Sequence, residues 1–366
     1  MARRGENIYK RKDGRWEGRY KNGFKPDGRV RYSSVYAHSY KNVRELLDEK
    51  RRHSDEGVNC RTVTINELFE LWFEAIRFKV KESTYANYLM KYEKHIFPFM
   101  GRVAYDHLTP DLLNCFISTK IQSGLSARYV ADIAGVLRSV CRFAHNRFGF
   151  MDRSGLISIP KCTSNEKKLL SGTEQSILNS YLLKEKTYLN VGILLAAATG
   201  IRLGELCSLK WADIDPLSGT VFVGHTLQRI RNCDSGSATK LVITSPKSNS
   251  SVRKIPLPVF VITILEKLRK DDDYFILSAC EKPLEPRTVQ YAFKKILRIN
   301  GLPDVSFHSL RHTFATNCIA LGFDAKTLSE LLGHSSVTIT LNRYVHSSME
   351  RKAKCMEKVS GMFIMS

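Results

Sequence analysis

Residues 305–317, with the sequence VSFHSLRHTFATN, bring two imidazoles and a guanidinium close together in a stretch that is otherwise mostly apolar or hydroxylic. The stretch predicts a helix on which His308 and Arg311 share one face and His312 lies near it. A zinc site, an anion site and a structural cluster all use such residues. Zinc peptidases need a glutamate between the two histidines, which HSLRH lacks, and its arginine, pointing into the same site, would repel a dication. The stretch therefore favours an anion site, with His312 in a packing or supporting role.

A second arginine of the same kind lies upstream. Residues 194–215, LLAAATGIRLGELCSLKWADID, predict an apolar helix, a break at Thr-Gly and a second helix. Arg202 and Glu205 lie three positions apart on that second helix. They form either an ion pair worth roughly 0.3 kcal/mol or a guanidinium that a carboxylate aims at an anion. Strands are predicted at residues 219–224, 239–245 and 251–258, and Lys247 falls in the turn PKSNSS between the last two.

The downstream stretch, KTLSELLGHSSVTITLNRYVH, predicts a helix that stops at Gly333, then His334, then a short helix that contains Tyr344. Taken alone, the helix pair at 327–344 fits a DNA-binding transcriptional regulator, and a tyrosine such as Tyr344 is most often a core or edge aromatic. Residues 359–366 form an apolar end, which we expect to dock either on its own domain or on a neighbouring copy.

Charge restricts the class of partner. The 366 residues include 57 Lys and Arg against 36 Asp and Glu, a formal net charge of +21. Such a balance favours a polyanionic partner, nucleic acid above all, over a membrane surface. The start of the chain has no apolar segment typical of a signal peptide. The nine cysteines are scattered without a CxxC pair, which predicts reduced thiols and a cytoplasmic protein.

The N-terminal residues predict a small sheet. Turn signals at DG and KPDG separate three strands within residues 7–36, and a helix follows at about 39–53. Alternation puts Trp16 and Tyr20 on one face with Val30, Tyr32 and Tyr36. The other face carries the candidate DNA-binding residues Arg15, Arg19, Arg29 and Arg31. Strands can carry side chains into a major groove; a solvated basic face is the alternative.

The next segment, from residue 62 to about 150, predicts four helices. Their candidate caps are Thr64 or Asn66, then Ser83, then Thr109 followed by Pro110. Arginines on the fourth helix either contact phosphates or form a solvated edge; they are Arg128, Arg138 and Arg142. Residues 151–168 contain Gly, Pro and Ser and predict an interdomain linker.

Four motifs together resemble the tyrosine recombinases: TGIRLGEL, SPKSNSS with RKIPL, HSLRHTFAT, and LSELLGHSSVTIT with its following tyrosine. Their order and spacing over about residues 170–350 are most similar to those of integrases of temperate phages and conjugative transposons. The two upstream segments resemble the arm-binding sheet and the helical, SAM-like core-binding domain of that family.

The resemblance implies roles for individual residues. Arg202, Arg311 and His334 match the positions that stabilise charge on the scissile phosphate, and Glu205 matches the acidic support of the first arginine. Tyr344 matches the nucleophile. Since a phenol has a reference pKa near 10, a base must help it, and His308 is the candidate. Lys247 would protonate the leaving 5′-oxygen. Arginines then take the place of a metal, so we expect no metal and no cofactor.

The implied fold is multidomain and mainly α. It comprises an arm-type DNA-binding domain at 1–56 with a three-stranded sheet and a helix, a helical core-binding domain at 62–155, and a mixed α+β catalytic domain at 165–366. The implied function is an integrase that cuts and rejoins double-stranded attachment-site DNA through a 3′-phosphotyrosyl intermediate, to integrate and excise a mobile element, phage or transposon.

The implied assembly is a homo-tetramer on DNA, with an excisionase and a DNA-bending protein as accessory partners, in the nucleoid of a bacterial host. The alternatives are the transcriptional regulator built on the helix pair at 327–344 and a type IB topoisomerase-like enzyme that relaxes DNA. The arginine-rich N-terminal segment argues against the topoisomerase.

Overall fold

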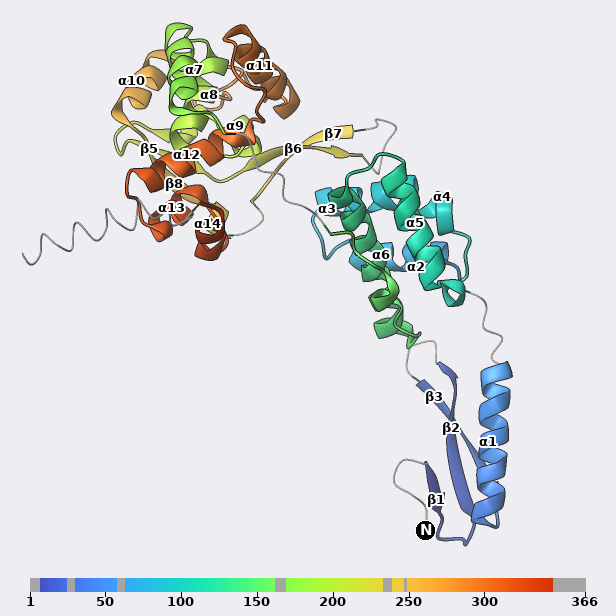
Figure 1. Ribbon diagram of the computed structural model, residues 1–366. Helices are drawn as coiled ribbons and strands as arrows, with labels where there is room; N and C mark the ends of the chain where they lie inside the picture. The colour runs from blue at the N-terminus through green and yellow to red at the C-terminus, as the bar shows by residue number, and fades with distance from the viewer. Residues whose placement is uncertain are drawn as a thin grey trace, which may run out of the picture. The chain divides into compact units, whose positions relative to one another are not determined.

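The computed structural model describes residues 7–24, 30–57, 63–161, 169–232, 239–246 and 249–344. The chain forms two compact units, Met1–Ser164 and Asn165–Ser366 (Figure 1). The predicted multidomain, mainly α architecture is confirmed. Lys247 and the C-terminal residues 359–366, both singled out by the sequence, lie outside the described residues. In the described part of the chain, no helix has the length and apolar character needed to cross a bilayer.

The N-terminal module is an antiparallel sheet with one helix against it, as predicted. The strands β1 (Ile8–Lys10), β2 (Trp16–Phe24) and β3 (Val30–Ala37) pair in the order β1-β2-β3, and α1 (Tyr40–Gly57) follows. Gly14 has φ +85° in the first turn, a conformation that favours glycine. The apolar core lies between sheet and helix, around Ile8, Val43 and Leu47.

The predicted face of β3 is wrong. Tyr36 pairs with Glu17 and is 46% exposed, so it lies on the outer face of the sheet, and Tyr32 is also exposed. Val35 and Ala37 pack against the helix instead. At Gly18, which pairs with Val35, a Cβ would lie 3.2 Å from Leu47, so the small residues of the two strands let α1 lie close to the sheet there.

The second module consists of helices capped largely as predicted. Thr64 and Glu67 form a reciprocal capping box, and Thr109 accepts a hydrogen bond from the backbone N–H of Leu112. The predicted cap at Ser83 is wrong, because the helix begins at Glu82, whose carboxylate lies at the positive end of the helix dipole. The α-helices are α2 (Ile65–Ile76), α3 (Glu82–Lys91), α4 (Phe97–Met100), α5 (Pro110–Gln122) and α6 (Ala127–Phe148). A π-helical turn (Tyr92–Ile96) and two 3₁₀ turns (Tyr105–His107 and Ser154–Leu156) complete the module.

An aromatic cluster forms much of the core of this module. Phe69 stacks on Tyr92 with ring centroids 4.3 Å apart, and Trp72 and Phe73 contact Phe69. Arg138, a candidate phosphate ligand, donates from its Nε to the Ile157 carbonyl at 3.1 Å and so ties α6 to the segment after it. Ile157 is itself buried in this core, so the first part of the predicted linker belongs to the helical module.

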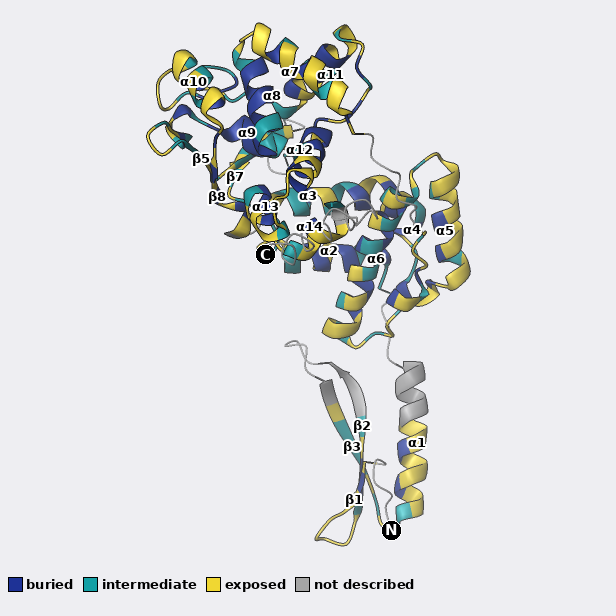
Figure 2. Ribbon diagram, turned by 60° about the vertical axis from the view of Figure 1, so that its left-hand side comes forward, coloured by how far each residue is buried: buried dark blue, intermediate teal, exposed yellow. Residues whose placement is uncertain are grey.

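In the second unit, the other elements pack around α8 (Tyr188–Thr199), a helix with buried residues on almost all sides (Figure 2). Two small antiparallel sheets accompany it, one in the order β4-β5-β8 and one of β6 and β7. The strands are β4 (Ile214–Asp215), β5 (Thr220–Val223), β6 (Thr226–Arg231), β7 (Thr239–Thr244) and β8 (Arg253–Pro256). The other α-helices are α7 (Gly172–Lys184), α9 (Leu203–Ser208), α10 (Val259–Leu268), α11 (Pro286–Ile299), α12 (His308–Ala320), α13 (Ala325–Leu332) and α14 (Val337–Tyr344), with 3₁₀ turns at Trp211–Asp213 and Asn249–Ser251. The three predicted strands correspond to β5, β7 and β8, whereas β4 and β6 were not predicted.

Candidate active site

A glycine forms the break between α8 and α9. Gly200 has φ +66°, and its N–H donates to the Ala196 carbonyl at 2.9 Å, which ends the helix. A Cβ at this position would lie 2.5 Å from a ring carbon of Phe314 and 2.8 Å from a methyl of Leu332. Only glycine therefore allows α12 and the end of α13 to approach the turn.

Arg202 follows this turn at the N-cap of α9, where its backbone is extended. Glu205 accepts from the Arg202 backbone N–H at 3.0 Å and from its Nη1 at 2.7 Å. Arg202 also donates from Nη2 to the Gly333 carbonyl at 3.0 Å, and its side chain remains 36% exposed. The expectation of a guanidinium held by Glu205 agrees with this geometry.

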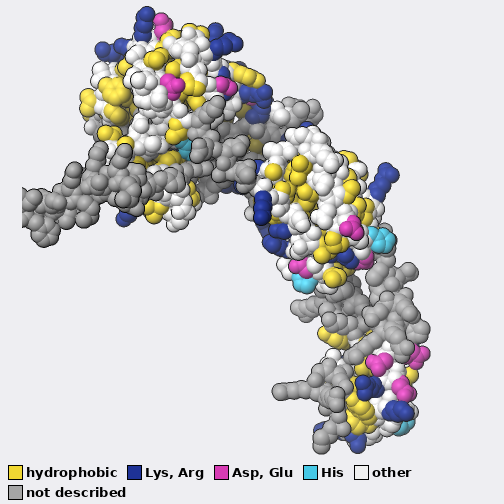
Figure 3. Space-filling view, viewed as in Figure 1, with side chains coloured by type: hydrophobic (Ala, Val, Ile, Leu, Met, Phe, Trp, Pro, Cys, Tyr) yellow, Lys and Arg dark blue, Asp and Glu magenta, His cyan; other side chains and the backbone are white. Residues whose placement is uncertain are grey.

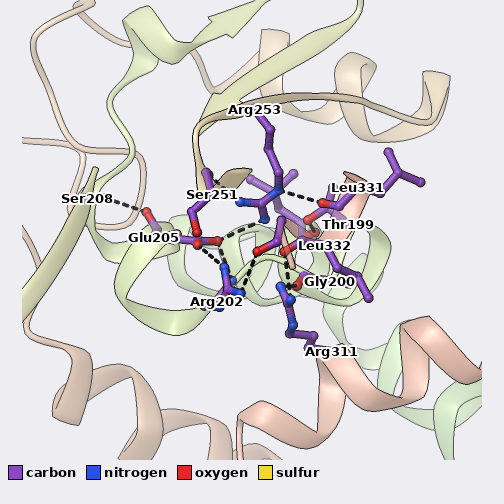
Figure 4. A network of polar contacts seen from close by, with 12 residues as sticks. Thr199, Gly200, Arg202, Glu205, Ser208, Ser251, Arg253, Arg311, Leu331 and Leu332 are labelled. Atoms are coloured by element: carbon purple, nitrogen blue, oxygen red, sulfur yellow. Dashed lines mark hydrogen bonds and ion pairs between the residues drawn. The ribbon is translucent and has the colours of Figure 1, made fainter. Parts of the chain in front are cut away.

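Arg253 is a third member of the cluster, which the sequence analysis did not single out. Its Nη2 donates to Glu205 at 3.1 Å, so Glu205 lies between two guanidinium groups (Figure 4). Burial acts to raise the pKa of Glu205, but the charges of Arg253 and Arg202 outweigh it and leave that pKa below its usual value. Because the carboxylate stays ionised, it can hold both arginines in fixed orientations.

Arg311 is 2% exposed on α12. Its Nη1 donates to the Gly200 carbonyl at 2.9 Å and its Nη2 to the Leu332 carbonyl at 2.8 Å. Burial, with the nearby charge of Arg202, lowers the pKa of Arg311 to about 9, so the group remains a cation at neutral pH.

Three consecutive carbonyls at the end of α13 each accept from a different arginine. Arg253 donates to Leu331, Arg311 to Leu332 and Arg202 to Gly333. The last carbonyls of a helix have no partner within the helix and carry its negative dipole end, so cations stabilise them. Gly333 then turns the chain with φ +65°, and His334 follows at once. The arginine cluster thus also fixes the position of His334.

Tyr344 lies at the end of α14, beside two histidines. Its hydroxyl is 2.6 Å from Nδ1 of His312, and its ring lies parallel to that of His334 at a centroid distance of 6.4 Å. His334 is oriented by a 2.8 Å hydrogen bond between its Nδ1 and the hydroxyl of Thr340, which is fully buried. A phenol, two imidazoles and the arginine cluster therefore meet at the ends of α12, α13 and α14.

The two histidines of α12 have different surroundings. His308, the expected base, is exposed and contacts the ring of His312 edge-on at 4.6 Å. His312, expected only to pack or support, is 4% exposed and is the residue hydrogen-bonded to the phenol. The periodicity of a single helix does not reveal this contact, because the partner comes from another helix.

An open cleft of about 350 Å³ lies beside the cluster. Arg202 and His334 line it, as do Pro246 and Ser251, which flank the segment that contains Lys247. Arg311, His308 and Tyr344 are not part of its lining. Among the described residues, no three His, Cys, Asp or Glu side chains gather in a possible metal cage.

The arginines of the N-terminal sheet have acidic neighbours. Arg15 is bonded to Asp13 at 2.8 Å, and Arg19 donates to the largely buried Glu17 at 2.9 Å. Arg11 and Arg15 both lie over the ring of Tyr36. The side chains of Arg29 and Arg31 are outside the described residues. Figure 3 shows Lys and Arg side chains exposed on this module and on the others.

Comparison with known proteins agrees with this geometry. Residues 167–351 match the model of the phage integrase family, and residues 64–121 match the N-terminal SAM-like domain of phage integrases. A XerC-like tyrosine recombinase of Caldanaerobacter subterraneus is 26% identical over 92% of this chain and 94% of its own length. The ICEBs1 integrase of Bacillus subtilis is 22% identical over 97% and 100%.

Solved structures share the fold. The integrase of transposon Tn1549, solved with circular intermediate DNA, superposes with a TM-score of 0.66 and 22% identity over 81% of this chain and 99% of that one. A lambda integrase dimer bound to a core site gives 0.59 and 18% over 94% and 97%. The α13–α14 pair is part of the arginine cluster rather than a separate module, and the regulator and topoisomerase alternatives are not favoured. The chain belongs to the phage integrase family and is a tyrosine-type site-specific recombinase.

Proposed function

We propose that this protein integrates and excises a mobile element by cutting double-stranded DNA with Tyr344, which forms a 3′-phosphotyrosyl bond and releases a 5′-hydroxyl. The observation that carries the proposal is the phenol of Tyr344 at 2.6 Å from His312, in the same cluster of helix ends as three guanidinium groups. The bond formed conserves the energy of the phosphodiester, so rejoining needs no cofactor.

Arg202 and Arg311 are proposed to stabilise the charge that develops on the non-bridging oxygens. Each guanidinium presents a planar fork of five donors. The bonds to Glu205 and to backbone carbonyls hold these forks in place before DNA arrives, so little reorganisation is needed in the transition state. His334, which is oriented by Thr340 and lines the cleft, is proposed to donate a further hydrogen bond to the phosphate.

Two proton transfers complete the reaction. The phenol can pass its proton to Nδ1 of His312, provided that His312 is neutral with its own proton on Nε2. We therefore propose that His312 is the general base. In this proposal His308 contacts the ring of His312 and does not accept the proton of the phenol. Lys247 is proposed to protonate the leaving 5′-oxygen. Its neighbours Pro246 and Ser251 line the same cleft as Arg202.

The DNA and oligomer partners follow from the reaction. Exchange between two duplexes takes four strand cuts, which predicts a homo-tetramer. A lambda integrase tetramer has been solved on a Holliday junction, and the net charge of +21 suits a DNA partner. We propose that residues 1–56 bind arm-type sites and that the helical module binds core sites. An excisionase, a DNA-bending protein and action at the nucleoid in the bacterial cytoplasm remain parts of the proposal.

Covalent capture tests the nucleophile. A pool of random-sequence duplexes, each nicked near its centre, is incubated with the protein in EDTA, and DNA that resists denaturant is sequenced. Wild type should yield adducts of a defined sequence, with the nucleotide on Tyr344 in mass spectra. Tyr344→Phe should bind the selected duplex but give no adduct, and Arg311→Ala should slow cleavage by about 100-fold or more. An adduct on another residue, or one that requires Mg²⁺, would overturn the assignment.

A further inference from the structure

Arg253 occupies the first position of β8, and none of the chemistry proposed above uses it. Its guanidinium is 6% exposed and donates to three separate segments. The acceptors are the Leu331 carbonyl at 2.6 Å, the Ser251 carbonyl at 3.0 Å and the Glu205 carboxylate at 3.1 Å. Arg253 is not among the residues that line the cleft. Any effect on the reaction must therefore pass through its partners.

Each partner is connected to a residue that faces the cleft. Glu205 holds Arg202 with its other oxygen, at 2.7 Å. Leu331 begins the run of three carbonyls that ends at Gly333, the residue before His334. Ser251 itself lines the cleft. A Cβ on Gly333 would lie 3.0 Å from Nη1 of Arg253, so the guanidinium packs directly against the turn before His334.

The fold keeps Arg253 rigid. Its backbone pairs with Val223 of β5, whose side chain is fully buried, and α13 packs against β8. A planar guanidinium satisfies three acceptors at fixed angles, which the point charge of a lysine cannot reproduce. What the arginine supplies is the fixed geometry of its donors, and not the positive charge alone.

We propose that Arg253 is a positioning residue for the recombination reaction. It orients Arg202 through Glu205, and His334 through the Leu331 carbonyl, toward the non-bridging oxygens of the scissile phosphate. This inference rests on the proposed function of those residues.

The substitution Arg253→Lys keeps the charge but not the fork. We expect the variant to fold and to bind DNA with the affinity of the wild type, because Arg253 does not reach the cleft. Its single-turnover cleavage should be slower by roughly 10- to 100-fold, the usual effect of misplaced catalytic groups. Arg269→Lys is the matched control, since Arg269 also joins a carboxylate and a backbone carbonyl in this unit but contacts none of these segments.

A neutral substrate separates positioning from stability. The duplex selected by covalent capture is made with a methylphosphonate at the scissile position, in which a methyl group replaces one charged non-bridging oxygen. With less charge to stabilise, misplaced guanidinium groups matter less. The ratio of wild-type to Arg253→Lys rates should therefore be smaller on the methylphosphonate than on the phosphate. A purely structural role would leave that ratio unchanged.

The outcomes are distinct. If the wild type gives no adduct on any duplex, the proposed function itself fails. If the wild type cleaves and Arg253→Lys cleaves equally well, or is equally slow on both substrates, only the role of Arg253 fails. Arg253→Gln, which retains donors without charge, serves as the second variant. Loss of the folded state in both variants would assign Arg253 to stability alone and would also overturn the proposal.

Discussion

At the scale of single residues, the ionisation of Glu205 makes the stability of the folded protein depend on pH. Its pKa in the folded protein is depressed below that of an unfolded chain, where a glutamate titrates near about 4.3. A depressed folded pKa contributes stability above the unfolded value, and this contribution is lost as pH falls through the folded pKa. The buried carboxylate between Arg202 and Arg253 should thus stabilise the catalytic unit at neutral pH and lose this effect in acid.

Glu205→Gln measures this contribution. The variant should melt at a lower temperature than wild type at pH 7, because it leaves the buried Arg253 and the partly exposed Arg202 without their counter-charge. The difference in melting temperature should shrink as the pH is lowered below about 4. A difference that stays constant between neutral and acid pH would contradict the account.

A second prediction at this scale concerns the contact between His312 and Tyr344. His312→Asn removes the proposed proton acceptor, which lies 2.6 Å from the Tyr344 hydroxyl, and should slow adduct formation by about 100-fold or more. His308→Asn is the control and should slow adduct formation less. A larger loss in His308→Asn than in His312→Asn would return the base to His308.

At the scale of elements, the close packing around the turn at Gly200 can be tested by substitution. Gly200→Ala combines a left-handed backbone with a Cβ at 2.5 Å from Phe314, whereas Gly301→Ala has nearly the same φ, +65°, and nothing within 4 Å. Both variants lose stability because alanine strains a left-handed backbone. Only Gly200→Ala also pushes α12 and α13 away from the turn, which should lower its free energy of unfolding by about 1–3 kcal/mol more. Chemical denaturation of both variants measures the difference, and equal losses would show that the turn has room to relax.

What the sequence could predict also differs by element. A cap depends on residues three apart, and the motifs around Arg202 and Arg311 are local, so the sequence could indicate Thr64 or Asn66 as a cap and the two arginines as candidate site residues. The face of β3 was predicted wrongly, because apolar residues occur at both parities and the choice between them depends on packing against distant segments. The contacts of Arg253 and His312 join distant segments, and no local spacing encodes them.

At the scale of the whole molecule, the N-terminal sheet should tune DNA affinity through charge. Arg19 forms an ion pair with Glu17, so substitutions that remove the two charges should have opposite effects on DNA affinity. Arg19→Ala should weaken binding of the full chain to arm-site DNA and reduce the salt slope by about 0.9 if it neutralises one phosphate. Glu17→Gln should strengthen binding at low salt. Unchanged salt slopes in both variants would place this face away from DNA.

The bonds from three arginines to the last carbonyls of α13 affect how a newly synthesised chain folds. The bond from Arg202 to Gly333 spans 131 positions of sequence, and the bond from Arg311 to Gly200 spans 111. Such long-range contacts close late in folding, after the loops between them have been ordered. A nascent, truncated or proteolysed chain that lacks residues 331–344 therefore keeps Arg202 and Glu205 but has neither the Gly333 carbonyl to which Arg202 donates nor Tyr344, the proposed nucleophile. We therefore expect the enzyme to become competent to cleave DNA only once synthesis and folding of this unit are complete, so that incomplete copies leave DNA intact.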